Sequence, residues 1–335
     1  MLAIGTAESQ VCRMINPVEI LSFGGIASIL ALMCAVIGGG VAALAPLVIG
    51  LRKLRWPASV TWLGLVLALV FGVLGTWLGA SAATTAVSAS PEIVQVAIAR
   101  AIAGAMYSES GSLLLLGLAF LLSSTATAVP GPIMPGEAGK VDFAAIGGAV
   151  AGAVLGTILA VVGILFLSDM RPSWIGIALY VVPFVATVGT VNVLVASLRI
   201  SSEDRNQQAR MVGLRGLTMA SAVVAVVLIG QLFANFGEIQ AFKAVAVASP
   251  DQKAAMLTTG LEVAGWARTL SWFLVLPVLF AGLGSILPHL GRADGRVAIG
   301  FGIASAQMII MAVCLVLMRS AINGIFQQLI GQVTP

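Results

Sequence analysis

Long apolar stretches alternate along the chain with short segments that are charged or rich in proline and glycine. An apolar run of about 20 residues is long enough to cross some 30 Å of hydrocarbon as a helix. The pattern therefore predicts an all-α, polytopic membrane protein with about eight transmembrane helices. The expected spans are residues 19–50, 58–86, 96–126, 142–168, 174–198, 216–236, 256–282 and 297–318.

Two segments outside these spans have patterns of their own. Residues 129–136, with the sequence VPGPIMPG, cannot continue a helix and predict an extended loop. Beyond Arg319, apolar residues recur at helical spacing, which predicts a short C-terminal amphipathic helix on the membrane surface. They are Ile322, Ile325, Phe326 and Leu329.

Composition supports an integral membrane protein and excludes several other classes. Hydrophobic residues make up 59% of the 335 residues and charged residues only 9%, with a mean hydropathy of +1.08. A soluble domain carries about a quarter charged residues, so no extramembrane enzyme domain is expected. The three cysteines are far apart, and His289 has no possible metal ligand near it in the sequence. We therefore expect no enzyme activity, no metal and no cofactor.

The charged residues gather in alternate loops. Ten Lys/Arg lie in the segments 51–57, 127–141, 199–215 and 288–296, whereas six are assigned to the opposite side and Arg268 lies inside a span. The net charge of +4 thus reflects loop positions and does not indicate nucleic-acid binding. By the positive-inside rule, the first set of loops faces the cytoplasm and both termini face the outer, periplasmic side. The predicted location is the bacterial inner membrane.

The two halves of the chain resemble one another. Gly72, Gly79 and Pro91 have spacings similar to those of Gly230, Gly237 and Pro250, at an offset of about 150–160 residues. Four spans fit into that offset, which predicts two four-helix repeats of the same orientation, residues 1–171 and 172–335.

Gly72, Gly75, Thr76 and Gly79 form a glycine–glycine–threonine–glycine pattern on the second predicted span. This pattern resembles the signature of the MotA/TolQ/ExbB family of proton-channel and stator subunits. In the second half, residues 237–245 and 249–255 look like its outer connector. The resemblance implies an oligomer or multi-subunit complex, with a single-span ExbD/MotB-like protein among the partners.

A carboxylate and a guanidinium stand out inside the apolar spans. Glu109 lies halfway along the third span, and Arg268 occupies a similar place in the seventh. Charge inside a bilayer is costly and marks a pathway or a partner. One hypothesis is that a pseudo-twofold axis brings Glu109 and Arg268 together as a buried ion pair. The other is that Glu109 is a protonatable carrier or gate.

Several polar and small residues are further candidates. Thr76, Ser108, Ser112 and Asn235 are candidates for an ion path, although hydroxyls in helices also bond back to their own backbone. Five glycines are expected to allow close helix packing because they lack a side chain. They are Gly72, Gly75, Gly79, Gly230 and Gly237.

Three functions are compatible with these patterns. The first is a MotA/TolQ/ExbB-like subunit of an inner-membrane complex driven by ion flow. The second is a non-conducting scaffold, derived from that family, which holds other membrane subunits. The third is a proton-translocating subunit like the rotor proteolipid of rotary ATPases, which residues 103–110 and 116–118 resemble.

Overall fold

A computed structural model describes residues 94–128, 140–166, 176–201, 205–245 and 250–290, together with Met33, Ile37, Trp77 and Leu78. These residues form five helices and one two-stranded ribbon. The helices are α4 (Val94–Ala128), α5 (Phe143–Phe166), α6 (Gly176–Ser197), α7 (Arg205–Val245) and α8 (Pro250–Leu290). The strands are β1 (Lys140–Val141) and β2 (Ile200–Ser201).

All five helices in the described residues are long and apolar enough to cross a membrane. They coincide with the expected spans 96–126, 142–168, 174–198, 216–236 and 256–282, which confirms a helical, polytopic membrane protein. The other three expected spans, the amphipathic tail and the extended loop lie outside the described residues. So does most of the first repeat, including Thr76 and the glycines Gly72, Gly75 and Gly79.

The predicted ends of two spans are wrong. Helices α7 and α8 have 41 residues each, far more than the expected spans 216–236 and 256–282. The expected loop residues 205–215 and 237–245 are helical in the structure. Arg, Gln, Glu and Lys are good helix formers, and charged side chains at the end of a span can reach water. Hydropathy therefore locates the part of a helix inside the bilayer and not its ends.

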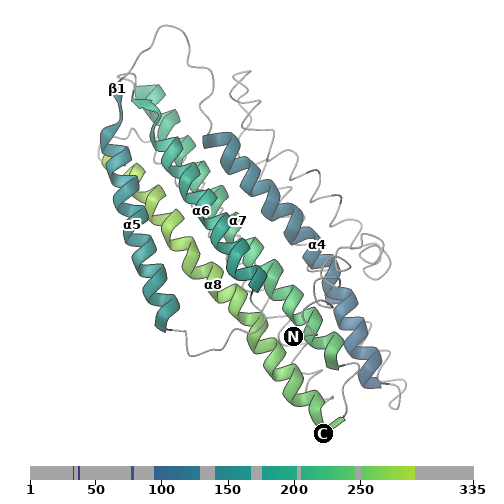
Figure 1. Ribbon diagram of the computed structural model, residues 1–335. Coiled ribbons are helices and arrows are strands. Elements are labelled where there is room, and N and C mark those ends of the chain that lie inside the picture. The colour runs from purple at the N-terminus through teal and green to yellow at the C-terminus, as the bar shows by residue number, and fades with distance from the viewer. Residues whose placement is uncertain are drawn as a thin grey trace.

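The helices lie roughly side by side along one long axis (Figure 1). Helix α8 contacts α5, α6 and α7, and α4 packs against α7 on the far side from α5. Strands β1 and β2 pair antiparallel, with Lys140 opposite Ser201 and Val141 opposite Ile200. His289, at the end of α8, contacts Asp142 next to β1. Three of the four loops that were grouped by charge therefore meet at one end of the bundle, which we call the Asp142 end.

The opposite end is marked by Lys243, an exposed residue near the end of α7. Lys243 and Arg215 are 28 residues apart on this helix, which corresponds to about 42 Å at 1.5 Å per residue. That distance accommodates a hydrocarbon layer of about 30 Å and part of both interfaces. We call this opposite end the Lys243 end.

A row of glycines joins α5 to α8. Gly148, Gly152 and Gly156 recur every four residues on α5, and a side chain on any of them would collide with the backbone of α8. The atoms in the way are the carbonyl oxygens of Gly284, Phe280 and Leu276, respectively. Small residues at this spacing let two helices approach closely in a membrane. The neighbouring Gly147, in contrast, faces open space.

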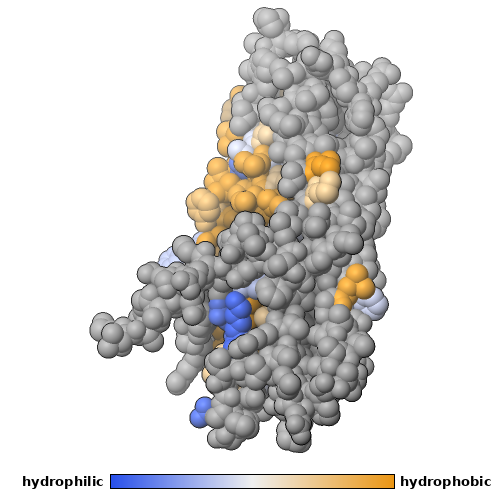
Figure 2. All heavy atoms as spheres, turned by 90° about the vertical axis from the view of Figure 1, so that its right-hand side faces the viewer, coloured by the Kyte–Doolittle hydropathy of each residue, from blue (hydrophilic) through white to orange (hydrophobic). Residues whose placement is uncertain are grey.

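Much of the remaining described surface is apolar. On α5 the exposed apolar side chains include Val154, Ile158 and Leu165. In Figure 2 the described side chains form a broad apolar area on the visible face, with a small hydrophilic group toward the lower end. A surface of this kind suits contact with lipid.

Candidate functional site

A polar cluster lies between α7 and α8, inside the candidate membrane spans of both helices. Four side chains form this Arg268 cluster: Gln231, Asn235, Glu238 and Arg268. The first three stand at positions i, i+4 and i+7 of α7 and therefore share one face of the helix. That face is directed at α8, where Arg268 lies.

The guanidinium of Arg268 bonds to α7 at two points. Arg268 Nε donates to Gln231 Oε1 at 2.7 Å, and Arg268 Nη2 donates to Glu238 Oε1 at 2.9 Å. Gln231 Nε2 in turn donates to Asn235 Oδ1 at 2.9 Å. The side chain of Glu238 is only 4% exposed and that of Arg268 25%. The cluster thus holds a positive and a negative charge in contact, away from bulk water.

Asn235 is fully buried, and its Nδ2 has no hydrogen-bond partner in the described part of the chain. A buried amide donor left without an acceptor costs about 1–3 kcal/mol. Buried polar groups in this situation are commonly satisfied by water.

Helix α4 adds polar groups beside the Lys243 end. Lys243 Nζ donates a hydrogen bond to the Tyr107 hydroxyl at 2.6 Å and lies 5.1 Å from the centre of the ring. These two distances place the ammonium beyond the hydroxyl and not above the ring face, so the contact is a hydrogen bond. Glu109, two residues further along α4, is 5% exposed.

Some of the site residues predicted from the sequence are described by the structure, and others are not. Glu109 is buried, and Ser112 Oγ bonds back to the Glu109 carbonyl at 2.8 Å. The carboxylate found in contact with Arg268 is that of Glu238; the pairing of Arg268 with Glu109 stays a prediction. Thr76 and the side chain of Ser108 lie outside what the structure describes.

The two packing glycines of the second half lie in the α7–α8 contact. A Cβ added to Gly237 would approach the Cβ of Ala264 to 2.8 Å, and one added to Gly230 would collide with Ser271. These close contacts set how α7 and α8 lie against each other, and so bring Arg268 within reach of Gln231 and Glu238.

Glu238 was not among the site residues predicted from the sequence. Glu238 was placed in a loop because of the predicted end of the span at residue 236. The signal that would have found it is the helical spacing of Gln231, Asn235 and Glu238, which requires α7 to continue past Gly237.

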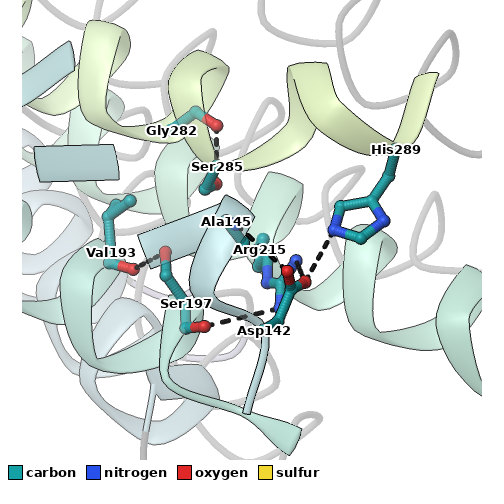
Figure 3. A network of polar contacts seen from close by, with 8 residues as sticks. All are labelled: Asp142, Ala145, Val193, Ser197, Arg215, Gly282, Ser285 and His289. Carbon is teal, nitrogen blue, oxygen red and sulfur yellow. Dashed lines mark hydrogen bonds and ion pairs between the residues drawn. The ribbon is translucent and has the colours of Figure 1, made fainter. Parts of the chain in front are cut away.

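A second polar cluster, the Asp142 cluster, joins three helices at the Asp142 end (Figure 3). Asp142 Oδ1 accepts a hydrogen bond from the Ala145 amide at 3.1 Å and so caps the start of α5. Asp142 Oδ2 contacts Arg215 Nη1 of α7 at 3.0 Å and His289 Nε2 of α8 at 2.6 Å. His289, without a partner nearby in the sequence, thus has one 147 residues away.

Electrostatics keeps Asp142 ionised. Burial alone would raise its pKa, but the hydrogen bond from the Ala145 amide and the charges of Arg215 and His289 outweigh this effect. The net result is a pKa below the ordinary value of 3.8. The carboxylate therefore balances the charge of Arg215, which is 1% exposed.

Further hydrogen bonds tie the ends of α4, α6 and α7 together. Arg199 Nη2 donates to the Thr127 carbonyl at 2.7 Å, and Thr218 Oγ1 donates to Thr127 Oγ1 at 2.9 Å. Burial, and secondly the nearby charge of Arg215, lower the pKa of Arg199. Asn192 Nδ2 of α6 donates to Ser124 Oγ of α4 at 2.8 Å. This end of the bundle is thus cross-linked by polar contacts over all five helices.

Comparison of the chain with protein-family models, with curated proteins and with solved structures finds no match. The class of the protein therefore follows from its own features: a polytopic helical membrane protein with a buried charge cluster between its helices. Within the described residues, no group of three or more His, Cys, Asp or Glu side chains could hold a metal ion.

Proposed function

We propose that this chain is a subunit of an ion-motive-force-coupled membrane complex, of the kind that its resemblance to the MotA/TolQ/ExbB proteins implies. The observation that carries the proposal is the Arg268 cluster. A charged side chain at the centre of a transmembrane helix costs about 2.5–3.5 kcal/mol or more, so such residues are rare and mostly functional. Here a cation and a carboxylate meet between two helices that also carry an amide pair.

The placement of the carboxylates fits ion coupling. Glu238 faces Arg268 on one side of α7, and Glu109 is buried on α4, which packs against α7. A carboxylate next to a fixed cation binds and releases a proton at the cost of weakening the pair. Proton binding at Glu238 would therefore alter the contact that joins α7 to α8.

Ion flux through the purified complex tests this function. The complex is reconstituted in liposomes, a pH or potential gradient is imposed, and proton entry is followed with an internal pH-sensitive dye. Glu109→Gln and Glu238→Gln are expected to abolish most of the flux. Glu262→Gln is the matched control, because Glu262 is an exposed residue on the same helix as Arg268. Equal flux in all three variants would contradict a conducting role.

Partner composition is the second test. The resemblance implies a single-span partner with an intramembrane aspartate, and mild-detergent purification followed by mass spectrometry should recover it together with this chain. If such a partner is absent and no flux is measured, the ion-coupled function is wrong.

A non-conducting scaffold is the second candidate, and one observation favours it. Two hydrogen-bond partners of the Arg268 guanidinium, Gln231 and Glu238, belong to the neighbouring helix α7, as expected for an ion pair that locks two helices. In a scaffold, Glu238→Gln would weaken the assembly without changing any flux. The two candidates thus differ in the flux measurement and not in the stability measurement.

A further inference from the structure

The middle of the described bundle contains no charged side chain. On α7, 22 uncharged residues separate Arg215 from Glu238, and on α8, 20 uncharged residues separate Arg268 from His289. Helices α5 and α6 contain no charged residue at all. The uncharged stretches of α7 and α8 are about 33 Å and 30 Å long at 1.5 Å per residue, which matches the hydrocarbon layer of a membrane. We call this level the uncharged layer; the Asp142 cluster lies at one edge of it and the Arg268 cluster at the other.

The short helix α5 fixes the depth of the bilayer on the longer helices. It has 24 residues, about 36 Å, which is little more than the hydrocarbon layer requires. Gly156 of α5 lies against Leu276 of α8, and the glycine row shows that the two helices run antiparallel. Ten residues further along α5, its last residue, Phe166, therefore lies level with Trp266 of α8. The end of α5 is thus at the level of the Arg268 cluster.

Helices α7 and α8 continue well past this end of α5 (Figure 1). The distance along α8 from Trp266 back to its first residue, Pro250, is about 24 Å. The contacts between α7 and α8 place residue 235 of α7 at the same level as Trp266, and α7 runs on from there for about 15 Å to Val245. Helix α4 packs along α7 in this part as well. We call this part the three-helix extension; its residues are 94–110, 236–245 and 250–266.

The three-helix extension has a packed interior of its own. Met106 of α4, Ile239 and Phe242 of α7, and Leu257 of α8 are all buried. Gly260 also brings α8 close to α7, because a Cβ at this position would collide with a side chain there. Contacts between the helices thus bury the apolar side chains of the extension, and no lipid is needed to cover them.

The exposed side chains of the two parts differ in character. In the uncharged layer they include large apolar residues such as Val154 of α5, Phe184 of α6 and Trp272 of α8. In the described residues of the extension, Met256 is the only large apolar side chain that is exposed. The other exposed residues there are polar or small: Lys243, Gln252, Ala255, Thr258, Thr259 and Glu262. In Figure 2 the hydrophilic group likewise lies toward the lower end, which is the Lys243 end in Figure 1.

We propose that membrane lipid covers only the uncharged layer, and that the three-helix extension projects about 15–24 Å beyond the hydrocarbon into the aqueous phase on the Lys243 side. Hydropathy alone would place α8 in the membrane from Ala255 onward. With the bilayer at the level of α5, the Arg268 cluster lies at the edge of the hydrocarbon, where a charge costs less than at its centre. The proposal concerns the position of the bilayer and does not require that the complex conducts.

Thiol labelling of the protein in liposomes tests this position. Cys12, Cys34 and Cys314 are first replaced by serine, and single cysteines are then introduced. Met256→Cys and Trp272→Cys are a matched pair, because both side chains are apolar, lie on α8 and are similarly exposed, at 42% and 44%. Thr259→Cys is a second test position in the extension. Gln252→Cys is the reference for water and Val154→Cys the reference for lipid, since both residues are exposed.

The reagent is a small, charged methanethiosulfonate, present on both faces of the liposomes so that the orientation of the protein does not matter. It reacts with the thiolate, which forms in water and not in hydrocarbon, and its own charge keeps it out of the hydrocarbon. Met256→Cys and Thr259→Cys are expected to react within about threefold of the rate of Gln252→Cys, and Trp272→Cys and Val154→Cys at least about tenfold more slowly.

Two outcomes would overturn the proposal. Slow reaction at Met256→Cys or Thr259→Cys would place the extension in lipid, and fast reaction at Trp272→Cys or Val154→Cys would show that lipid does not cover the uncharged layer. Size-exclusion chromatography in detergent checks that each variant is folded. The labelling uses no ion gradient, so its result does not depend on the flux measurement, and the two proposals fail separately.

Discussion

Arg268 on α8 and Glu238 on α7 form an ion pair with an Nη2–Oε1 distance of 2.9 Å inside the candidate membrane spans of both helices. In this pair each side chain is a counter-charge for the other. The guanidinium keeps its charge at all physiological pH values, so it needs the carboxylate beside it. The carboxylate is 4% exposed and has this cation as a counter-charge.

Removal of the carboxylate charge should destabilise the protein. In Glu238→Gln, Arg268 loses the charge of Glu238 but keeps the hydrogen bond to Gln231. Breaking a buried pair costs about 3–5 kcal/mol, and the partial exposure of Arg268 should reduce this to about 2 kcal/mol. Thermal unfolding in detergent measures the change, with Glu262→Gln as the exposed control.

The double variant Glu238→Gln/Arg268→Gln distinguishes the contribution of the ion pair to stability from that of other contacts. If the pair is the cause, the second substitution should recover much of the stability that Glu238→Gln removes. Additive losses in the double variant would show that the two side chains act independently.

The glycine row of α5 makes a sharper prediction because two adjacent glycines differ in their surroundings. A side chain at Gly148 collides with the Gly284 carbonyl, whereas one at Gly147 meets nothing within 4 Å. Gly148→Val should therefore push α5 away from α8 and destabilise the bundle by about 1–3 kcal/mol. Gly147→Val should leave the unfolding temperature almost unchanged, and an equal loss in both variants would argue against the close helix contact.

The sequence could predict which segments cross the membrane but not which charges meet. Span positions depend on local hydropathy, so all five described helices lie where the apolar runs are. The Arg268–Glu238 pair depends on how α7 lies against α8, which is set by the close contacts at Gly230 and Gly237. Because the sixth span was predicted to end before Gly237, Glu238 was assigned to a loop.

The contacts within the Asp142 cluster were even harder to predict from the sequence. Asp142, Arg215 and His289 belong to three different helix ends, and the contact of Asp142 with His289 joins residues 147 positions apart. Loop charge grouped these ends together, and in the structure they meet at one end of the bundle. It carried no information on which side chains touch, because that depends on helix length and rotation.

Asp142 should also make stability depend on pH in the acidic range. Its pKa in the folded protein lies below the ordinary value of 3.8, so folding favours the ionised form. The stabilisation is then fully present above pH 3.8 and is lost as the pH falls through the folded pKa. In Asp142→Asn, Arg215 stays buried without its counter-charge, which should cost about 3 kcal/mol at neutral pH.

The measurement for Asp142 is the unfolding free energy of the original and the Asp142→Asn protein as a function of pH. The difference between the two should shrink as the pH falls below about 4. A difference that stays constant at the acidic end would show that the charge of Asp142 does not provide the stabilisation.

Tyr107 and Lys243 provide a last test, at the opposite end of the bundle. Their hydrogen bond of 2.6 Å joins α4 to α7. Tyr107→Phe removes the acceptor and keeps the buried ring, so the expected loss of stability is only about 1 kcal/mol. The freed, exposed Lys243 can reach water, so no buried charge is left without a partner. Thermal unfolding in detergent measures the change, and a loss as large as that of Glu238→Gln would show that this contact is more than a single hydrogen bond.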